Sequence, residues 1–326
     1  MPSCHAYIFV AACLKSPLVF PQMSTVDKAL FAEYVDAAYF DWLAGRGNDV
    51  QDDQAQVMLL GYLAELGKTD LAGSDLIPRI PGVMQELLKN MRDENVSTAD
   101  LALLIKKDVV LLVAVLKEAN SALYSPATPI IDLNKAIQLL GHNGLRLLLA
   151  KAATRPIFNA KLGAFTKTVG PKIWEHTEAR AIACSLLARQ RGIDQFQAFL
   201  AGLMQDVGLM VAFRVFDRAE VNPTLSSSMV FRKNLRKQAR TLSSQIGRVW
   251  ELPPSVLLAI TEQDSDKPGG EWSALGQLLR MGDFISKACV LVNGGWLREE
   301  VGTFKEVLPK DEADCLFALI KVTKLG

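Results

Sequence analysis

Apolar residues recur at the spacing of an α-helix along nearly the whole sequence, and this periodicity limits the fold more than any other feature. Phe196, Phe199, Leu200, Leu203 and Val207 form one such stripe. Residues three, four and seven positions apart lie on one face of a helix. No run alternates apolar and polar residues long enough to predict a strand. The sequence therefore predicts an all-α, multi-helix bundle.

Composition and charge narrow the class of protein. Half of the 326 residues are hydrophobic, enough for a sizeable core, and 36 basic residues nearly balance 35 acidic ones. No global field therefore attracts nucleic acid or a membrane surface. The five cysteines lack a Cys-x-x-Cys spacing, so a reduced, cytoplasmic protein is expected. No apolar run reaches the roughly 20 residues that span a bilayer, so we expect no membrane helix.

The chain is divided into four predicted segments: 1–22, 23–75, 76–290 and 291–326. The first is interpreted as an extension ahead of Met23, a plausible start. The second carries ten acidic and three basic residues, so we expect a helical leader that forms a solvated outer layer. Pro78 and Pro81 forbid a continuing helix and mark the start of the main domain. The last segment is expected to be a C-terminal helical tail.

Local signals place several helix ends inside the main domain. Ser97, Asp108 and Asp194 are predicted N-caps, because short polar side chains accept hydrogen bonds from the first turn. Gly192 is predicted to end a long helix. A single helix is expected over 196–210. Gly141 and Gly144 are expected to separate apolar stretches.

His176, Asp206 and Asp283 are predicted to point into the core from three helices, because each lies at helical spacing from apolar neighbours. A buried hydrogen-bonded network is one interpretation, since unpaired buried charge is costly. A mononuclear metal site is another, although one good imidazole and two carboxylates cannot make a dinuclear centre. Arg180, one turn beyond His176, could supply the charge of an ion, or it could be a solvated or interface arginine.

Several segments follow one another in an order typical of a known family: 77–81, 119–124, 136–141, 174–176, 199–208 and 250–253. As a set they resemble the HDOD (HD-related output domain) branch of the HD superfamily of metal-dependent phosphohydrolases, over about 76–290. The resemblance implies two helical subdomains around a metal pocket. It also implies a regulatory, often non-catalytic, signalling role in bacteria.

The sequence departs from the family pattern at its expected metal ligands. Gln205 precedes Asp206 where a histidine would complete a His-Asp pair, Ser243 replaces another histidine, and Gln263-Asp264 replaces a His-His pair. An amide is a poor transition-metal ligand, and metal-assisted hydrolysis needs a firmly held ion. The resemblance therefore implies a pseudo-enzyme with a vestigial pocket lined by His176, Arg180, Gln205, Asp206 and Asp283; a weakly held metal would use His176, Asp206 and Asp283.

Two further groups of residues were considered as binding sites. Asn120, Ser121 and Tyr124 could contact a ligand, but Ser121 has no neighbouring base, and a helix-capping role is preferred. His142 is interpreted as a surface turn residue. Basic residues gather on one side of a predicted helix over 229–249, and they could bind anions or a partner: Arg232, Lys233, Arg236, Lys237 and Arg240.

A solvated face is the preferred interpretation of these basic residues, because no aromatic residue lies among them. The acidic leader of one molecule or of a partner could also dock on this helix, with dimerisation as one outcome. We expect a cytoplasmic, non-catalytic regulatory module that binds another protein and uses no cofactor. A phosphohydrolase of nucleotides or cyclic dinucleotides is the first alternative and a nucleic-acid-binding regulator the second. A homodimer is left open, and no membrane partner is expected.

Overall fold

The computed structural model describes residues 28–45, 53–69, 82–91, 97–121, 124, 126–158, 163–220, 229–264, 271–297 and 301–324. These residues form helices and no strand, which confirms the all-α prediction. In chain order the helices are α2 (Lys28–Ala44), α3 (Asp53–Leu66), α4 (Gly82–Met91), α5 (Thr98–Lys106), α6 (Val109–Ala119), α7 (Leu133–Phe158), α8 (Ala164–Arg191), α9 (Gln195–Met204), α10 (Val207–Arg218), α11 (Met229–Val249), α12 (Pro254–Glu262), α13 (Ala274–Asn293), α14 (Val301–Val307) and α15 (Lys310–Lys324). The predicted extension at 1–22 and the proline-rich segment at 77–81 lie outside the described residues.

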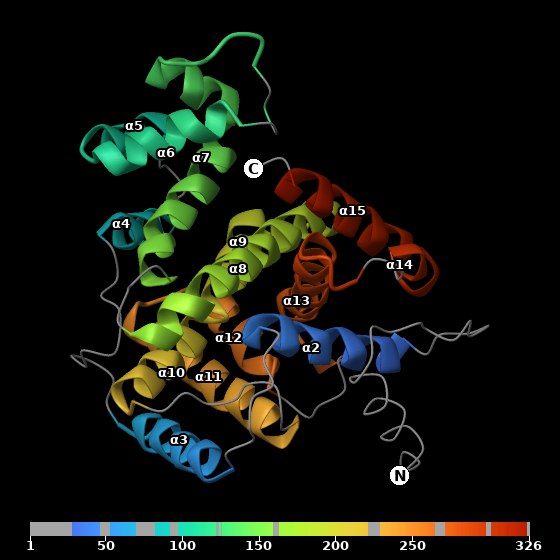
Figure 1. The fold of residues 1–326 in the computed structure, drawn as a ribbon. Helices are drawn as coiled ribbons and strands as arrows, with labels where there is room; N and C mark the ends of the chain where they lie inside the picture. The colour runs from blue at the N-terminus through green and yellow to red at the C-terminus, as the bar shows by residue number, and fades with distance from the viewer. Residues whose placement is uncertain are drawn as a thin grey trace.

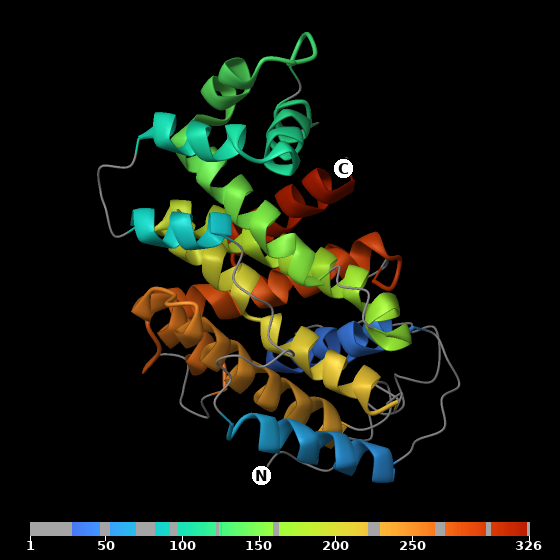
Figure 2. The same ribbon diagram turned by 90° about the vertical axis from the view of Figure 1, so that its left-hand side faces the viewer.

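The helices form a main body with one projecting end (Figure 1). Within the body, α8 packs against α9, α13, α10 and α15, while α11 packs against α10 and α12. The projecting end consists of α5, α6 and the first part of α7, which pack on one another (Figures 1 and 2). Because α8 touches so many neighbours, its inner face is where side chains from several helices can meet.

Four predicted helix ends are confirmed. The Ser97 hydroxyl accepts a hydrogen bond from the amide of Asp100, and the Asp108 carboxylate accepts two from the start of α6. Asp194 caps α9 in the same way, after Gly192 has ended α8 with a left-handed φ of 67°. These residues fix the ends of the helices that carry the buried polar groups.

A second glycine, Gly141, kinks α7 with φ 67° and ψ 177°, as the sequence predicted. Gly144 lies within the helix and does not break it, so that expectation was wrong. His142 follows the kink inside α7, half-buried, with Nδ1 3.5 Å from the Thr98 hydroxyl, and is not a surface turn residue.

The expected single helix over 196–210 is divided at Gln205 and Asp206 into α9 and α10. The bend is stabilised from α11: the Ser243 hydroxyl donates to the carbonyl of Gln205 at 2.7 Å and accepts from the amide of Gly208 at 2.8 Å. A Cβ at Gly208 would collide with the backbone of α11, so the glycine permits this close approach.

The stretch 195–218 is long and apolar enough to cross a membrane, but 94% of its most apolar window is buried inside the fold.

The prediction that the acidic leader forms a solvated outer layer was wrong for α2. This helix packs on α13 and α8 and buries six large apolar side chains: Phe31, Val35, Tyr39, Phe40, Trp42 and Leu43. Its acids do not prevent burial because Asp36 and Asp41 meet cations from α11 and α13. In α3, by contrast, Leu59 and Leu63 are buried whereas Val57 is 72% exposed.

Candidate functional site: a buried charge network

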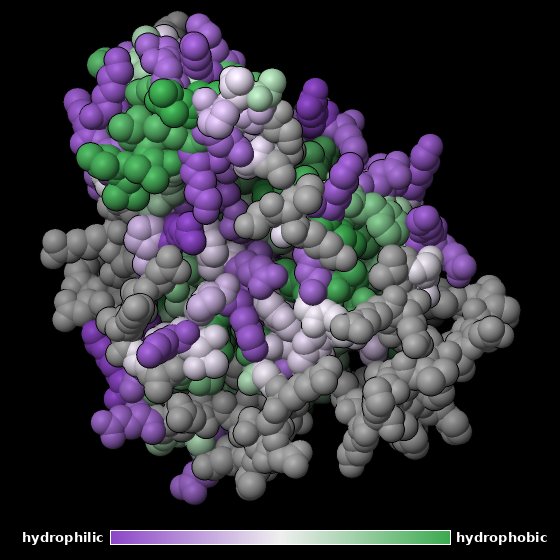
Figure 3. All heavy atoms as spheres, turned by 45° about the horizontal axis from the view of Figure 1, so that its top comes forward, coloured by the Kyte–Doolittle hydropathy of each residue, from purple (hydrophilic) through white to green (hydrophobic). Residues whose placement is uncertain are grey.

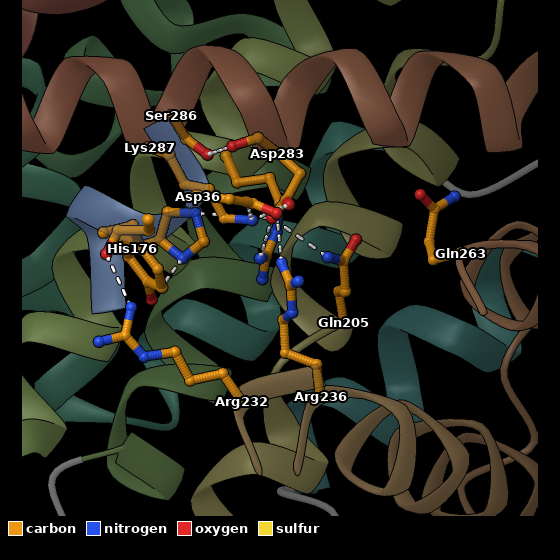
Figure 4. A network of polar contacts seen from close by, with 12 residues as sticks. Asp36, His176, Gln205, Arg232, Arg236, Gln263, Asp283, Ser286 and Lys287 are labelled. Carbon is orange, nitrogen blue, oxygen red and sulfur yellow. Dashed lines mark hydrogen bonds and ion pairs between the residues drawn. The ribbon is translucent and has the colours of Figure 1, made fainter. Parts of the chain in front are cut away.

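Five parts of the chain bring polar side chains to one place beside α8 (Figure 4). They are α2, α8, the bend between α9 and α10, α11 and α13, and their side chains line a small shared pocket. The five residues predicted to form the vestigial pocket all meet here: His176, Arg180, Gln205, Asp206 and Asp283. The first two are 1% and 0% exposed, so both side chains are removed from bulk solvent.

Arg180 is at the centre of the network. One terminal nitrogen donates to Asp206 Oδ2 at 2.7 Å and to Asp283 Oδ1 at 3.0 Å, and Nε donates to the carbonyl of Gly202 at 2.9 Å. Burial opposes the ionisation of Asp206, but the Arg180 charge and the contact with His176 together outweigh it and hold the pKa of that carboxyl well below its usual range. The interpretation of Arg180 as a solvated or interface arginine is therefore wrong.

The imidazole of His176 lies between the same two carboxylates. Its Nδ1 is 3.0 Å from the Tyr39 hydroxyl and 3.3 Å from Asp206 Oδ2, while Nε2 is 3.6 Å from Asp283 Oδ1. Burial lowers the pKa of His176, with the Arg180 charge adding to that effect and the two carboxylates opposing it. The histidine is therefore neutral near pH 7, and the positive charge of the network belongs to other residues.

A second cation, Lys287, completes the charge balance. Its ammonium group lies 2.6 Å from Asp283 Oδ2 and 2.7 Å from Asp36 Oδ1, and Arg236 pairs with the other oxygen of Asp36 at 2.5 Å. Burial alone would raise the pKa of Asp36, but Lys287 and Arg236 lower it to about 2. Three carboxylates thus face three cations: Asp36, Asp206 and Asp283 against Arg180, Arg236 and Lys287.

A divalent metal, as the family resemblance implies, does not fit this arrangement. The carboxylate oxygens nearest His176 already accept from Arg180, and the remaining oxygen of Asp283 accepts from Lys287. The cavity beside them is about 20 Å³, enough for about one water molecule. In the part of the chain that the structure describes, no three His, Cys, Asp or Glu side chains are arranged to hold a metal ion. A metal would have to displace the Arg180 guanidinium.

The three positions predicted to have lost histidines serve different purposes. The amide of Gln205 donates to Asp283 Oδ1 at 3.2 Å, so it belongs to the network. Ser243 binds the backbone at the α9–α10 bend. Gln263 lies apart from the cluster (Figure 4), where its amide donates to the carbonyls of Ala259 and Gly276. Of these positions, Gln205 alone has its side chain within the network.

The basic residues of α11 are mostly engaged within the protein. Arg232 pairs with Asp41 at 2.6 Å and is 5% exposed, Arg236 pairs with Asp36, and Arg240 donates to the carbonyl of Gln263 at 2.8 Å. The interpretation of a solvated face therefore holds for Lys233 and Lys237 but is wrong for the three arginines. Within the chain the leader contacts this helix in two ways: α3 packs against it, and Asp36 and Asp41 of α2 pair with its arginines.

Asn120, Ser121 and Tyr124 lie in the projecting end and do not line the pocket. The Asn120 amide donates to the carbonyls of Leu116 and Ile130 and its oxygen accepts from the Ile130 amide, all at 2.8 Å. This side chain therefore holds the loop before α7 in place through hydrogen bonds, as the capping interpretation expected.

The residues that sequence reasoning missed are Asp36, Tyr39 and Lys287. Lys287 lies four residues after Asp283 on one helix face, a usable signal. For Asp36 and Tyr39 the sequence offered only the charge match between the acidic leader and the helix over 229–249.

Comparisons with known proteins agree with this architecture. The model of the HDOD domain family matches residues 77–265, more than half of the chain. An uncharacterised Treponema pallidum protein is 24% identical over 139 residues, which cover 42% of this chain but 26% of that protein.

Solved structures share the fold. A candidate metal-dependent phosphohydrolase from Shewanella amazonensis superposes with a TM-score of 0.56 at 19% identity, covering 82% of this chain and 99% of that one. An HDOD domain protein of unknown function from Geobacter sulfurreducens gives 0.55 at 17%, covering 84% and 96%. A candidate signal-transduction protein from Marinobacter aquaeolei gives 0.52 at 17%, covering 86% and 68%.

Proposed function

The chain belongs to the HDOD domain family, and from this premise we propose that it is a signal-transduction module that catalyses no reaction and acts by binding another protein. One observation carries the proposal: the Arg180 guanidinium lies within hydrogen-bonding distance of both carboxylates that would otherwise be metal ligands. The network is neutral as it stands. A fixed organic cation stabilises buried carboxylates but cannot generate a metal-bound hydroxide.

A metal-dependent phosphohydrolase is the second candidate, favoured by the retained side chains of His176, Asp206 and Asp283. It would require Arg180 to leave two buried ion pairs, which costs several kcal/mol because the guanidinium and both carboxylates would lose their partners.

Binding of nucleic acid receives less support. Arg232, Arg236 and Arg240 already contact groups of the same chain and offer few free cations to a phosphate backbone.

Metal content and hydrolysis test the proposal together. The full chain, purified without chelator, would be subjected to elemental analysis and then assayed with manganese, iron or nickel on a nucleotide, a cyclic dinucleotide and an aryl phosphate. We expect no stoichiometric metal and no hydrolysis above the level of His176→Ala. Metal-dependent hydrolysis that His176→Ala abolishes would overturn the proposal in favour of the enzyme.

A further inference from the structure

The outer face of α6 is apolar yet uncovered by any described part of the chain. Val109, Val110 and Val113 are 75%, 73% and 58% exposed, and Leu103 of the neighbouring α5 is 54% exposed. The opposite face of α6 buries apolar residues against α7. A helix that is apolar on both faces is ordinarily buried on both, so the outer face has the character of an interface.

This surface lies on the projecting end of the molecule, away from the buried charge network. Figure 3 shows hydrophobic residues gathered over the α5–α6 end of the visible face. The α5, α6 and α7 helices pack on one another there, so the surface is presented by a supported element. An aspartate side chain introduced at Val109 or Val113 would extend into solvent, so such a variant should fold and can be used to test this surface.

Three exposed lysines border this surface. Lys106, Lys107 and Lys117 are exposed, and none of them has an ion-pair partner among the described residues. The nearby acids lie at helix starts or in an ion pair: Asp100 and Asp108 are in the N-terminal capping contacts of α5 and α6, where the helix dipole offsets negative charge, and Glu118 pairs with Lys151 at 3.5 Å. An approaching partner therefore meets apolar side chains bordered by lysines.

We propose that this surface, Leu103, Val109, Val110 and Val113 with Lys106, Lys107 and Lys117, binds a partner protein through an amphipathic helix whose apolar face is flanked by acidic residues. Opposite charges steer such a helix onto the surface, and the valines provide the buried contact. A second copy is a poorer match, because a two-fold contact would bring lysines against lysines. A lipid surface is also a poorer match, since residues 97–121 contain no aromatic anchor.

The inference rests on the protein-binding part of the proposed function and is tested separately from it. Two designed helical peptides of roughly 18 residues, or five turns, would share a leucine face and differ only in glutamate or lysine flanks. Binding to the full chain would be measured by fluorescence anisotropy at low and high salt. We expect the glutamate peptide to bind, more weakly as salt rises, and the lysine peptide not to bind.

Variants locate the binding. Val113→Asp, and separately the triple change Lys106→Glu, Lys107→Glu and Lys117→Glu, should each weaken binding of the glutamate peptide by roughly tenfold or more. Matched controls are Val57→Asp on α3, which is 72% exposed, and Lys233→Glu with Lys237→Glu on α11; these should leave binding unchanged. Circular dichroism would verify that each variant is folded.

Three results would overturn the inference. The first is equal binding of both peptides or of neither. The second is co-sedimentation with phosphatidylglycerol vesicles that Val113→Asp abolishes, which would assign the surface to a membrane. The third is a dimer in light scattering that becomes monomeric with Val113→Asp, which would assign it to a second copy. Any of these would leave the metal and hydrolysis results unchanged, so the proposed function would stand or fall on its own.

Discussion

At the scale of single residues, the site is governed by the cost of burying charge. Asp206 and Asp283 are both held close to His176 in a setting from which water is nearly excluded, and like charges so placed repel one another. Arg180 makes the arrangement stable because one nitrogen serves both carboxylates. The neutral state of His176 follows from the same balance.

Substitution of Arg180 tests this account. Arg180→Ala should lower the free energy of unfolding by about 3–5 kcal/mol, because it leaves two buried carboxylates without their shared cation. Denaturant unfolding followed by circular dichroism measures the change. Arg191→Ala is the matched control, since Arg191 pairs with the half-exposed Asp311, and its loss should cost about 1 kcal/mol or less. Equal effects of the two substitutions would mean that the buried pairs are not stabilising.

The neutral imidazole predicts how stability changes with pH. Burial lowers the pKa of His176 in the folded protein, whereas in the unfolded chain this pKa keeps its ordinary value of 6.5. Below pH 6.5 the unfolded chain therefore binds a proton more readily than the folded protein does. The free energy of unfolding should therefore fall as pH drops below 6.5, with a slope of up to about 1.4 kcal/mol per pH unit. Denaturant titrations at about six pH values between 7.5 and 5 would measure this slope.

The control for this prediction is His142, whose pKa is also lowered by burial and by Arg146 but which is half-buried. His176→Gln should flatten the pH dependence more than His142→Gln does. If His142→Gln removes most of the slope, the charge state assigned to His176 is wrong.

At the scale of secondary-structure elements, α2 is the part that sequence reasoning misjudged. Its periodicity predicted a helix, but its excess of acids suggested exposure. The cations that allow its burial are far away in the sequence: Lys287 and Arg236 pair with Asp36 across separations of 251 and 200 residues. Such pairings are set by tertiary packing, which no local pattern records. The inward direction of His176, Asp206 and Asp283 could be predicted because each follows from the period of its own helix.

Two aspartates of α2 should respond differently to neutralisation. Lys287 and Arg236 lower the pKa of Asp36 to about 2, so its ionised form stabilises the fold above about pH 4, and that contribution is lost as pH falls toward 2. Burial instead raises the pKa of Asp41 despite Arg232. At pH 7, Asp36→Asn should cost about 1–2 kcal/mol, allowing for its partial exposure, and Asp41→Asn close to none. Thermal unfolding of both variants measures this, and the reverse order would contradict it.

At the scale of the whole molecule, the site depends on helices outside the region that matches the family. One cluster of buried apolar side chains extends from Phe31 in α2 to Leu319 in α15. Asp36 and Tyr39 reach the network from α2, which precedes residue 77. The predicted division at 76–290 rested on the prolines at its start and on the extent of the family resemblance, and neither shows which helices share a core.

A fragment of residues 76–290 should therefore lose cooperative unfolding. It lacks α2, whose six large buried apolar side chains contribute on the order of 10 kcal/mol of transfer free energy, comparable with the roughly 5–15 kcal/mol of net stability typical of a domain. Losing Asp36 would also leave Lys287 and Arg236 without a shared carboxylate. We expect a broad thermal transition and strong binding of a hydrophobic dye. A fragment of 76–326 retains α15 and separates its contribution from that of α2. Sharp unfolding of the shorter fragment at the temperature of the full chain would mean that 76–290 is an autonomous domain and that α2 is an accessory to it.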